Sequence, residues 1–222
     1  MQTKLQISEI FYSLQGESTF AGLPCIFIRL SGCNLRCNYC DAEYTWESGK
    51  DYTLTDILAA IGKYPCKLVE VTGGEPLHQN ACHTLLQELL TAGYDVLLET
   101  NGSLALSSIP EKVTTIIDVK CPESGSESSF LADNLIEIKR RVKQNPGSCE
   151  LKFVLSSKND FLWACNFISK QQIDTLLPLL FSPVKGRISP TDLAAWIMET
   201  NLAVRLQLQL HTILWPDKSR GV

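Results

Sequence analysis

Residues 27–40 read FIRLSGCNLRCNYC, an apolar run that leads directly into a loop with three cysteines, Cys33, Cys37 and Cys40. Cysteine thiolates are the usual ligands of iron–sulfur clusters, and a four-iron cluster normally takes four of them. Three local cysteines leave one iron open unless a distant cysteine supplies the fourth ligand. An open iron can bind a small chelating molecule. The spacing therefore indicates a [4Fe–4S] cluster that takes part in chemistry.

A structural zinc site is the alternative for the same thiols, with a fourth ligand such as His78 or His211. Zinc sites usually draw paired C-x-x-C segments from separate parts of a chain, whereas one short loop supplies all three thiolates here. The compact cluster is therefore the favoured interpretation. The other six cysteines are scattered and are expected to be buried core residues. Of these, only Cys121, beside Lys120, is expected near the site.

Composition indicates an ordinary globular protein. The chain has 222 residues, enough for one hydrophobic core, and we expect a single domain over residues 1–222. With 45% hydrophobic and 20% charged residues, the chain is not intrinsically disordered. The net charge of −4 and the lack of a basic run argue against a nucleic-acid-binding protein. No segment has the pattern of a signal peptide or of a membrane helix, so we expect a cytoplasmic protein without a membrane partner.

Short β-rich runs alternate with helical patterns along the chain. Thr53 is a plausible N-cap for a helix over Leu54–Ile61, and Gly93 suits the C′ position of a helix over Ala81–Thr91. Further helices are predicted at Asn134–Val142, Asp160–Ser169 and Pro190–Thr200. Strands are predicted at Gln6–Tyr12, Cys25–Leu30, Leu68–Thr72, Asp95–Thr100, Thr115–Val119, Leu151–Leu155, Leu177–Phe181 and Ala203–Leu208.

This alternation predicts an α/β fold with parallel strands joined by right-handed crossovers. In such sheets, functional residues gather at the carboxyl ends of the strands. The unusual segments of this chain follow predicted strand ends, and we expect them on one face. They are Gly32–Cys40, Gly73–Pro76, Asn101–Gly102 and Lys120–Pro122.

The C-x-x-x-C-x-x-C spacing, with Tyr39 before the last cysteine, resembles the signature of the radical S-adenosylmethionine (SAM) superfamily. Thr72–Pro76, which reads TGGEP, is similar to the superfamily's glycine-glycine-glutamate motif. The resemblance implies a partial (β/α) barrel with mostly parallel strands and helices outside. It also implies that the open iron chelates SAM. The reduced cluster then cleaves SAM to methionine and a 5′-deoxyadenosyl radical, which takes a hydrogen atom from the substrate.

Further segments resemble one family within this superfamily, the 7-carboxy-7-deazaguanine synthases of queuosine and deazapurine biosynthesis. These enzymes are lyases that convert 6-carboxy-5,6,7,8-tetrahydropterin to 7-carboxy-7-deazaguanine with loss of ammonia. The resemblance covers nearly the whole chain, apart from about Glu123 to Cys149. The segments are Ile10–Ser18, Phe27–Cys33, Cys40–Trp46, Glu99–Gly102, Asp118–Lys120 and Gln209–His211.

The resemblance implies three groups of site residues. Cys33, Cys37 and Cys40 would hold the cluster. SAM would contact Tyr39, Cys40, Asp41, Gly74, Glu75, Asp118, Val119, Lys120, Phe181, Ser182, Pro183 and Val184. The substrate would contact Leu14, Gln15, Gly16, Glu17, Arg29, Thr72 and His211.

Three of the substrate residues have the chemistry that a carboxylated pterin needs. Gln15 can donate and accept hydrogen bonds, and Glu17 can accept from ring N–H groups. Arg29 can form a forked pair with a carboxylate. Because an unpaired charge within an apolar strand is costly, Arg29 is expected to have a ligand or a buried partner.

Magnesium is the open question among the cofactors. The family binds Mg²⁺ near the substrate through a threonine two residues after the last cysteine, and this chain has Ala42 there. Mg²⁺ requires oxygen ligands in octahedral geometry but often retains several waters. Water can replace the hydroxyl, or Thr45 or Asp41 can supply an oxygen. Alternatively, the protein works without the metal or acts on a related substrate.

The family resemblance also implies a homodimer and an electron donor such as flavodoxin or ferredoxin. Two other functions share the cluster motif and remain as alternatives. One is an activase that installs a glycyl radical on a partner protein. The other is a non-catalytic iron–sulfur protein, such as an electron carrier or a regulatory binding protein.

Overall fold

A nine-stranded sheet forms the centre of the protein in the computed structural model, which describes residues 3–222. The strands are β1 (Lys4–Leu14), β2 (Pro24–Leu30), β3 (Lys50–Thr53), β4 (Leu68–Gly73), β5 (Asp95–Thr100), β6 (Thr114–Asp118), β7 (Cys149–Leu155), β8 (Leu179–Pro183) and β9 (Val204–Leu206). Their order across the sheet is β3-β1-β2-β4-β5-β6-β7-β8-β9. β1 is antiparallel to β2 and β3, and every other pair is parallel.

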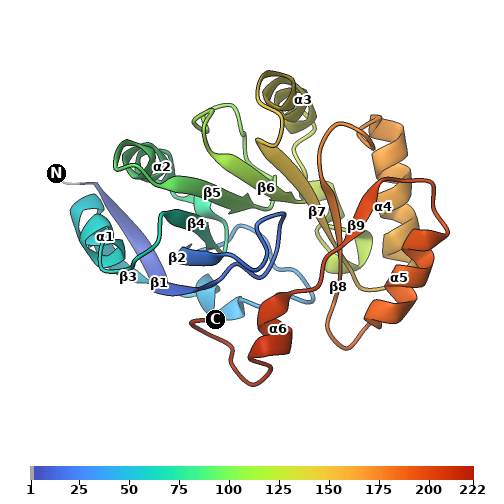
Figure 1. Cartoon of the computed structure of the whole chain (residues 1–222), viewed down its shortest axis with the longest axis horizontal. Helices are drawn as coiled ribbons and strands as arrows, with labels where there is room; N and C mark the ends of the chain where they lie inside the picture. Colours follow the sequence, from blue (N-terminus) through green and yellow to red (C-terminus); the bar gives the residue numbers. More distant parts are fainter. Residues whose placement is uncertain (1–2) are drawn as a thin grey trace.

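Helices α1 to α5 cover the outer side of this curved sheet. The α-helices are α1 (Leu54–Ile61), α2 (Cys82–Thr91), α3 (Asn134–Gln144), α4 (Lys158–Gln171), α5 (Pro190–Met198) and α6 (Leu210–Leu214). Figure 1 shows α1 to α5 around the outside, and α6 on the inner side near the C-terminus. The sheet is open, with β3 and β9 as its edges. It is therefore a partial barrel with mostly parallel strands and outer helices, as the resemblance to the radical SAM superfamily implied.

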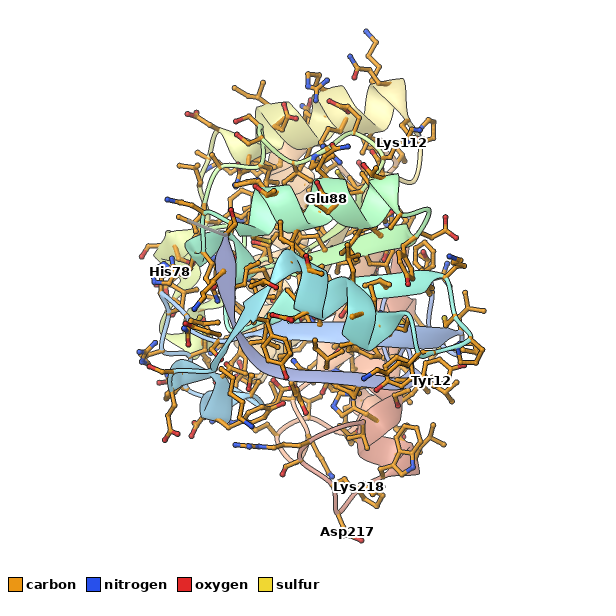
Figure 2. All side chains as sticks on the ribbon, turned by 90° about the vertical axis from the view of Figure 1, so that its left-hand side faces the viewer. Tyr12, His78, Glu88, Lys112, Asp217 and Lys218 are labelled. Atoms are coloured by element: carbon orange, nitrogen blue, oxygen red, sulfur yellow. The ribbon has the colours of Figure 1, made fainter. Side chains whose placement is uncertain are left out.

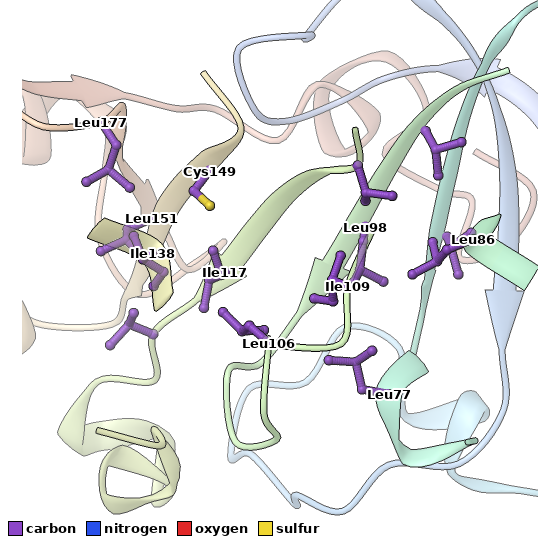
Figure 3. Packing of buried hydrophobic residues seen from close by; sticks show 14 of the residues in the cluster. Leu77, Leu86, Leu98, Leu106, Ile109, Ile117, Ile138, Cys149, Leu151 and Leu177 are labelled. Atoms are coloured by element: carbon purple, nitrogen blue, oxygen red, sulfur yellow. The ribbon is translucent and has the colours of Figure 1, made fainter. Parts of the chain in front are cut away.

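The hydrophobic core lies between the sheet and the outer helices. Figure 3 shows Leu98, Ile117 and Leu151 of β5, β6 and β7 on the side where Leu86 of α2 and Ile138 of α3 pack. All five side chains are fully buried. Burying a side chain of this size contributes about 1.5–3 kcal/mol. This packing holds the neighbouring strands in register and leaves their other face free for polar residues.

Local signals explain several element boundaries. Thr53 caps α1 in a capping box, because its side chain accepts from the Asp56 N–H while the Asp56 carboxylate accepts from the Thr53 N–H. Gly93, with φ at +78°, ends α2 in the left-handed region that favours glycine. The sequence predicted Thr53 as an N-cap and Gly93 at the C′ position, but not the reciprocal bond from Asp56.

Two elements were not predicted, and both are short. β3 forms because its four residues pair with Lys4–Ile7 of β1, and α6 spans five residues, too few to show a helical period.

In the side view of Figure 2, Lys112 and Asp217 lie at opposite ends of the molecule. No helix within residues 3–222 is both long and apolar enough to cross a membrane.

Candidate active site

Polar side chains from five neighbouring strands face the inner side of the sheet. Successive residues of a strand point to opposite faces, so residues that alternate with core positions point away from the outer helices. They are Arg29 in β2, Thr72 in β4, Glu99 in β5, Asp118 in β6 and Lys152 in β7. All five line one cavity of about 610 Å³. The alternation of side chains between the two faces of each strand thus places these polar residues on the same surface of the sheet.

The cysteine loop, residues 33–40, is tied to the segments that follow two of these strands. The Asn101 side-chain amide donates to Asn34 Oδ1 over 3.1 Å, after β5. The Asn38 N–H donates to the Ser124 carbonyl over 3.0 Å, after β6. Because the loop has little regular structure of its own, these bonds set its position at the carboxyl ends of the strands.

The three cysteines of this loop fit an iron–sulfur cluster. Cys33, Cys37 and Cys40 are free thiols, and all three line the cavity. Burial raises the pKa of Cys33 and Cys40, so cluster binding must displace protons from these thiols. Among residues 3–222, no three His, Cys, Asp or Glu side chains are already grouped as a metal site, and this includes the three cysteines. Of the two histidines considered as a zinc ligand, His211 lines the cavity and His78 does not.

The glycine pair at the end of β4 lets the cysteine loop pack against the sheet. A Cβ on Gly74 would lie 2.2 Å from the Gly32 carbonyl oxygen and 2.8 Å from Cys33 Cβ. Gly73 has φ at +153°, and a Cβ there would lie 2.2 Å from the Leu30 carbonyl oxygen. A larger residue at Gly73 would displace the end of β2, and one at Gly74 would displace the start of the cysteine loop.

Glu75 is fully buried and does not line the cavity. Its carboxylate accepts from the Leu77 N–H over 3.0 Å, the Thr100 hydroxyl over 2.8 Å and the Asn101 N–H over 2.7 Å. Burial raises its pKa, and these donors partly offset the effect. The structure therefore places this glutamate between the ends of β4 and β5. There its carboxylate oxygens accept hydrogen bonds from other residues of the protein.

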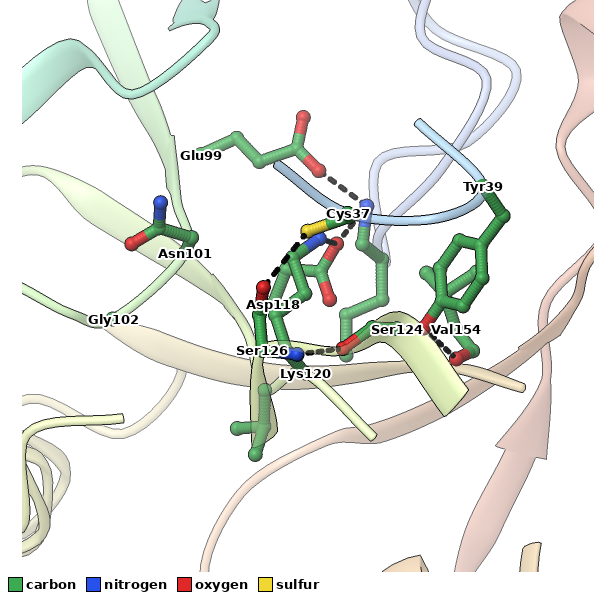
Figure 4. Close-up of polar contacts among 12 residues, drawn as sticks. Cys37, Tyr39, Glu99, Asn101, Gly102, Asp118, Lys120, Ser124, Ser126 and Val154 are labelled. Carbon is green, nitrogen blue, oxygen red and sulfur yellow. Dashed lines mark hydrogen bonds and ion pairs between the residues drawn. The ribbon is translucent and has the colours of Figure 1, made fainter. Parts of the chain in front are cut away.

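A buried ion cluster forms the floor of the cavity. Lys152 pairs with Glu17 over 2.8 Å, with Glu99, and with Asp118 over 3.5 Å. Lys120 pairs with Asp118 over 2.9 Å, and Figure 4 shows Asp118 and Lys120 close to Cys37. Burial favours the neutral amine, but the carboxylates outweigh it and raise the pKa of Lys152. Burial opposes the Asp118 charge, but the two lysines lower its pKa overall.

Gln15 and Glu70 form a second polar pair beside this cluster. Gln15 Nε2 donates to Glu70 over 2.5 Å, and Gln15 Oε1 accepts from the Glu17 N–H over 3.1 Å. Burial, together with the charges of Glu99 and Glu17, raises the pKa of Glu70 to about 8. Glu17 Oε1 also accepts from the Gln209 amide over 2.9 Å. The turn after β1 is therefore held rigid by side-chain hydrogen bonds.

Arg29 has the buried partner that its place in an apolar strand predicts. Its Nε lies 2.9 Å from Glu9 Oε1, and the Tyr44 hydroxyl donates to the same oxygen over 2.8 Å. Burial lowers the pKa of Arg29, but Tyr44 and Glu9 raise it overall. Within the described residues, its two terminal nitrogens have no hydrogen-bond partner. Arg29 therefore retains a fork of donors beside the cavity.

The other predicted substrate residues, Leu14, Gly16, Thr72 and His211, also line the cavity. The Gly16 carbonyl accepts from the Leu210 N–H over 3.1 Å, and a Cβ on Gly16 would lie 3.2 Å from His211 Nδ1. The structure thus brings residues from both ends of the chain into one surface.

The predicted SAM residues fall into two groups. Tyr39, Cys40, Asp41, Gly74, Asp118, Lys120 and Val184 line the cavity, whereas Glu75, Val119, Phe181, Ser182 and Pro183 are buried beside it. Phe181 packs edge-on against Phe153 and belongs to the core. Asp118 Oδ1 is buried without a hydrogen-bond partner in residues 3–222. This free acceptor and the volume of the cavity suit a ligand with an ammonium or hydroxyl donor.

Ala42 does not provide a magnesium ligand. Its side chain has no oxygen, and its carbonyl accepts from the Thr45 N–H over 2.9 Å and the Thr45 hydroxyl over 2.7 Å. Thr45 is fully buried and does not line the cavity. Asp41 is the neighbouring oxygen donor that does line it. The side chains at the family's magnesium position therefore do not fit the metal through Ala42 or Thr45.

The sequence analysis assigned no site role to Glu70, Glu99 or Lys152, although Glu99 begins one of the segments that resemble the family. The signal was present, because each is a charge within an otherwise apolar strand, as Arg29 is. By contrast, no pattern in the sequence marks Trp46 or Arg187 as cavity residues, because loops bring them there.

Comparisons with known proteins agree with this arrangement. The radical SAM superfamily model matches residues 27–122, from β2 to just after β6. A 7-carboxy-7-deazaguanine synthase of Koribacter versatilis is 40% identical over 98% of this chain and 100% of its own length. One of Chlorobaculum tepidum is 42% identical over 100% of this chain and 99% of its own.

Solved structures show the same fold. QueE from Escherichia coli has a TM-score of 0.71 at 24% identity, covering 92% of this chain and 94% of that one. Streptococcus suis SuiB bound to precursor peptide SuiA has a TM-score of 0.56 at 16% identity, and the match covers 82% of this chain and 48% of SuiB. Since full-length relatives share about two residues in five with it, this chain belongs to the 7-carboxy-7-deazaguanine synthase family of the radical SAM superfamily.

Proposed function

We propose that this protein converts 6-carboxy-5,6,7,8-tetrahydropterin to 7-carboxy-7-deazaguanine with loss of ammonia, as a radical SAM lyase of queuosine biosynthesis. One observation carries the proposal. The cysteine loop and the polar groups of Gln15, Glu17 and Arg29 line the same cavity. The names of the full-length relatives give the product, and the family resemblance implies the substrate and the loss of ammonia.

The cofactors would bind at the end of the cavity formed by the cysteine loop. Cys33, Cys37 and Cys40 would hold the cluster, and Asp118 and Gly74 would contact SAM beside it. When bound, the cluster and SAM supply the one-electron chemistry that begins the reaction. The task of the chain is to place both reactants and to exclude water.

The substrate would bind over the inner face of β2, β4 and β5. The free nitrogens of Arg29 would pair with its carboxylate, because a guanidinium fork matches carboxylate geometry. Glu17 and the remaining amide hydrogen of Gln15 would meet the ring nitrogens. His211 and Thr72 would border the same ring.

No step of this proposal passes through Mg²⁺, because Ala42 and Thr45 offer it no side-chain oxygen at the cavity. Asp41 is the carboxylate available for a metal beside that position. Activity measured with Mg²⁺ and with a chelator distinguishes an enzyme that needs the metal from one that does not. A metal held through Asp41 predicts loss of activity in the chelator.

Anaerobic turnover tests the function directly. The protein with a reconstituted cluster is mixed with the carboxypterin, SAM and a reductant, and products are identified by mass spectrometry. We expect the deazaguanine and ammonia in equal amounts. Arg29→Gln should retain iron and SAM binding but lose most product. Absence of product from a protein with a full cluster would overturn the proposal. That result would favour one of the alternative functions, an activase or an electron carrier.

The biological setting is also part of the proposal. A homodimer, a flavodoxin- or ferredoxin-type donor and a place in the cytoplasm are inferred from the family resemblance. Analytical ultracentrifugation tests the dimer. Turnover with purified flavodoxin or ferredoxin as the sole reductant tests the donor.

A further inference from the structure

Lys152 is a buried cation of the cavity to which the proposed cluster, SAM and substrate contacts assign no role. Its side chain is 4% exposed and projects from the middle of β7. It contacts carboxylates from three other parts of the fold, Glu17 after β1, Glu99 in β5 and Asp118 at the end of β6. A charge buried this deeply depends on its partners, because an unpaired buried charge strongly destabilises a fold.

The three carboxylates do not depend on Lys152 equally. Asp118 also pairs with Lys120 over 2.9 Å. Glu17 and Glu99 have no other ion pair with a lysine or arginine in residues 3–222, although the Arg29 charge also acts on Glu99. Glu70 lies near both glutamates, and their charges favour its neutral form. Without the Lys152 cation, like charges would crowd together, and a carboxylate of the group would take up a proton. Lys152 therefore matters most to Glu17 and Glu99.

Both glutamates are arranged as acceptors beside the cavity that they line. Glu17 uses one oxygen for Lys152 and the other for the Gln209 amide over 2.9 Å. Glu99 uses one for Lys152 and the other for the Thr72 hydroxyl over 3.1 Å. A carboxylate oxygen can accept more than one hydrogen bond, so each retains capacity toward a ligand.

We propose that Lys152 is a positioning residue that holds Glu17 and Glu99 ionised and directed into the cavity. There they accept from N–H groups along one edge of a nitrogen-rich heterocyclic substrate. The identity of that ring rests on the proposed function, whereas the charge state of the two glutamates does not. Loss of the cation would leave the carboxylates of this group without their shared counter-ion, which disfavours ionisation within the group.

Lys152→Met in the holoenzyme tests this, with Lys152→Arg as the conservative variant and Lys143→Met as a control on the exposed side of α3. We expect the KM for the carboxypterin to rise about 100-fold, with iron content and SAM binding unchanged. The acid side of the pH profile should move to higher pH. Lys152→Arg should recover part of the loss, and Lys143→Met should match wild type.

Glu99→Gln covers the case in which Lys152→Met does not fold. It keeps the lysine and removes one acceptor charge, so we expect weaker pterin binding with the cluster intact. Unchanged KM and pH profile in Lys152→Met, or unchanged pterin binding in a folded Glu99→Gln, would overturn the proposal.

A measurement without substrate separates this inference from the proposed function. Infrared difference spectra of the holoenzyme near neutral pH should show an additional protonated carboxyl in Lys152→Met that Lys143→Met lacks. If wild type neither binds nor converts the pterin but this signal is present, the proposed function fails and the electrostatic role of Lys152 remains. If the signal is absent, the role assigned to Lys152 is wrong.

Discussion

Glu70 lies within β4 and Glu75 follows the end of that strand. Both are buried glutamates, and their partners give them different roles. Burial raises the pKa of both. Glu75 accepts three hydrogen bonds, two of them from backbone N–H groups, which favour its ionised form. Glu70 accepts from Gln15 and faces two other carboxylates, which favour its neutral form. The first joins two strand ends, whereas the second lies beside the cavity.

Replacing Glu75 with alanine should destabilise the fold strongly. Three donors would lose their acceptor in the protein interior, and each buried unsatisfied donor costs about 1–3 kcal/mol. We expect urea denaturation to show a loss of at least about 3 kcal/mol. Glu88→Ala, on the exposed side of α2, is the matched control and should change stability little. A loss below about 1 kcal/mol in Glu75→Ala would contradict this role.

Glu70 should make the stability of the protein depend on pH. Its pKa is raised from 4.5 to about 8, so between these values the folded state binds a proton that the unfolded chain has released. The stabilisation is complete below the unfolded pKa and is lost as pH rises to about 8. Denaturation across this range should show a declining free energy of unfolding. Glu70→Gln should flatten the decline, and an equally steep decline in that variant would count against the assignment.

The cysteine loop is an irregular element whose shape comes from its neighbours. Asn34 and Asn38 tie it to the segments after β5 and β6. Gly74 lets the segment after β4 approach the loop more closely than any side chain would allow, and Gly73 does the same for the end of β2. The glycines of the TGGEP segment thus act on the cysteine loop through packing.

Gly74→Ala should lower iron incorporation. The new methyl group would lie 2.2 Å from the Gly32 carbonyl oxygen, and this contact must displace the cysteine loop. Iron content and cluster absorbance after reconstitution measure the effect, and we expect a loss of more than about half, since a 1 Å shift at a site is costly. Gly147→Ala meets no atom within 4 Å despite its positive φ, so it should cost only about 1 kcal/mol of backbone strain. Normal iron content in Gly74→Ala would refute the packing argument.

The two ends of the described chain complete one side of the cavity together. The Gly16 carbonyl, after β1, accepts from the Leu210 N–H of α6. Glu17 accepts from Gln209, which lies 192 positions later in the sequence. An open sheet leaves this side of the inner face uncovered, and α6 returns across it (Figure 1).

Gln209→Ala should weaken substrate binding and leave the cluster intact. The change removes one hydrogen bond that orients Glu17, and a hydrogen bond to a charged group contributes about 1.5–3 kcal/mol. We expect the KM for the pterin to rise about tenfold or more, with iron content unchanged. Gln87→Ala, on the exposed face of α2, should have no effect. A KM in Gln209→Ala equal to that of wild type would show that α6 does not position Glu17.

Much of the fold could be predicted because its signals are local. Apolar runs, the Thr53 cap and Gly93 lie within a few residues of the elements that they specify. The antiparallel pairing of β1 and the short strand β3 could not, because both depend on contacts between distant segments. The same division holds for the site, where the cysteine spacing is local and the ion cluster around Lys152 is not.

The order of elements, the three cysteines and the glycine pair are properties of the sequence, since each depends on residues within a short span. Only the tertiary structure decided which charges meet. It directed the Glu75 carboxylate into the protein interior and brought Gln15 within hydrogen-bonding distance of Glu70. It also placed Lys152 between carboxylates from three separate segments. The physical reason is that Coulomb and hydrogen-bond energies depend on distance and burial, and both are set by how the strands pack.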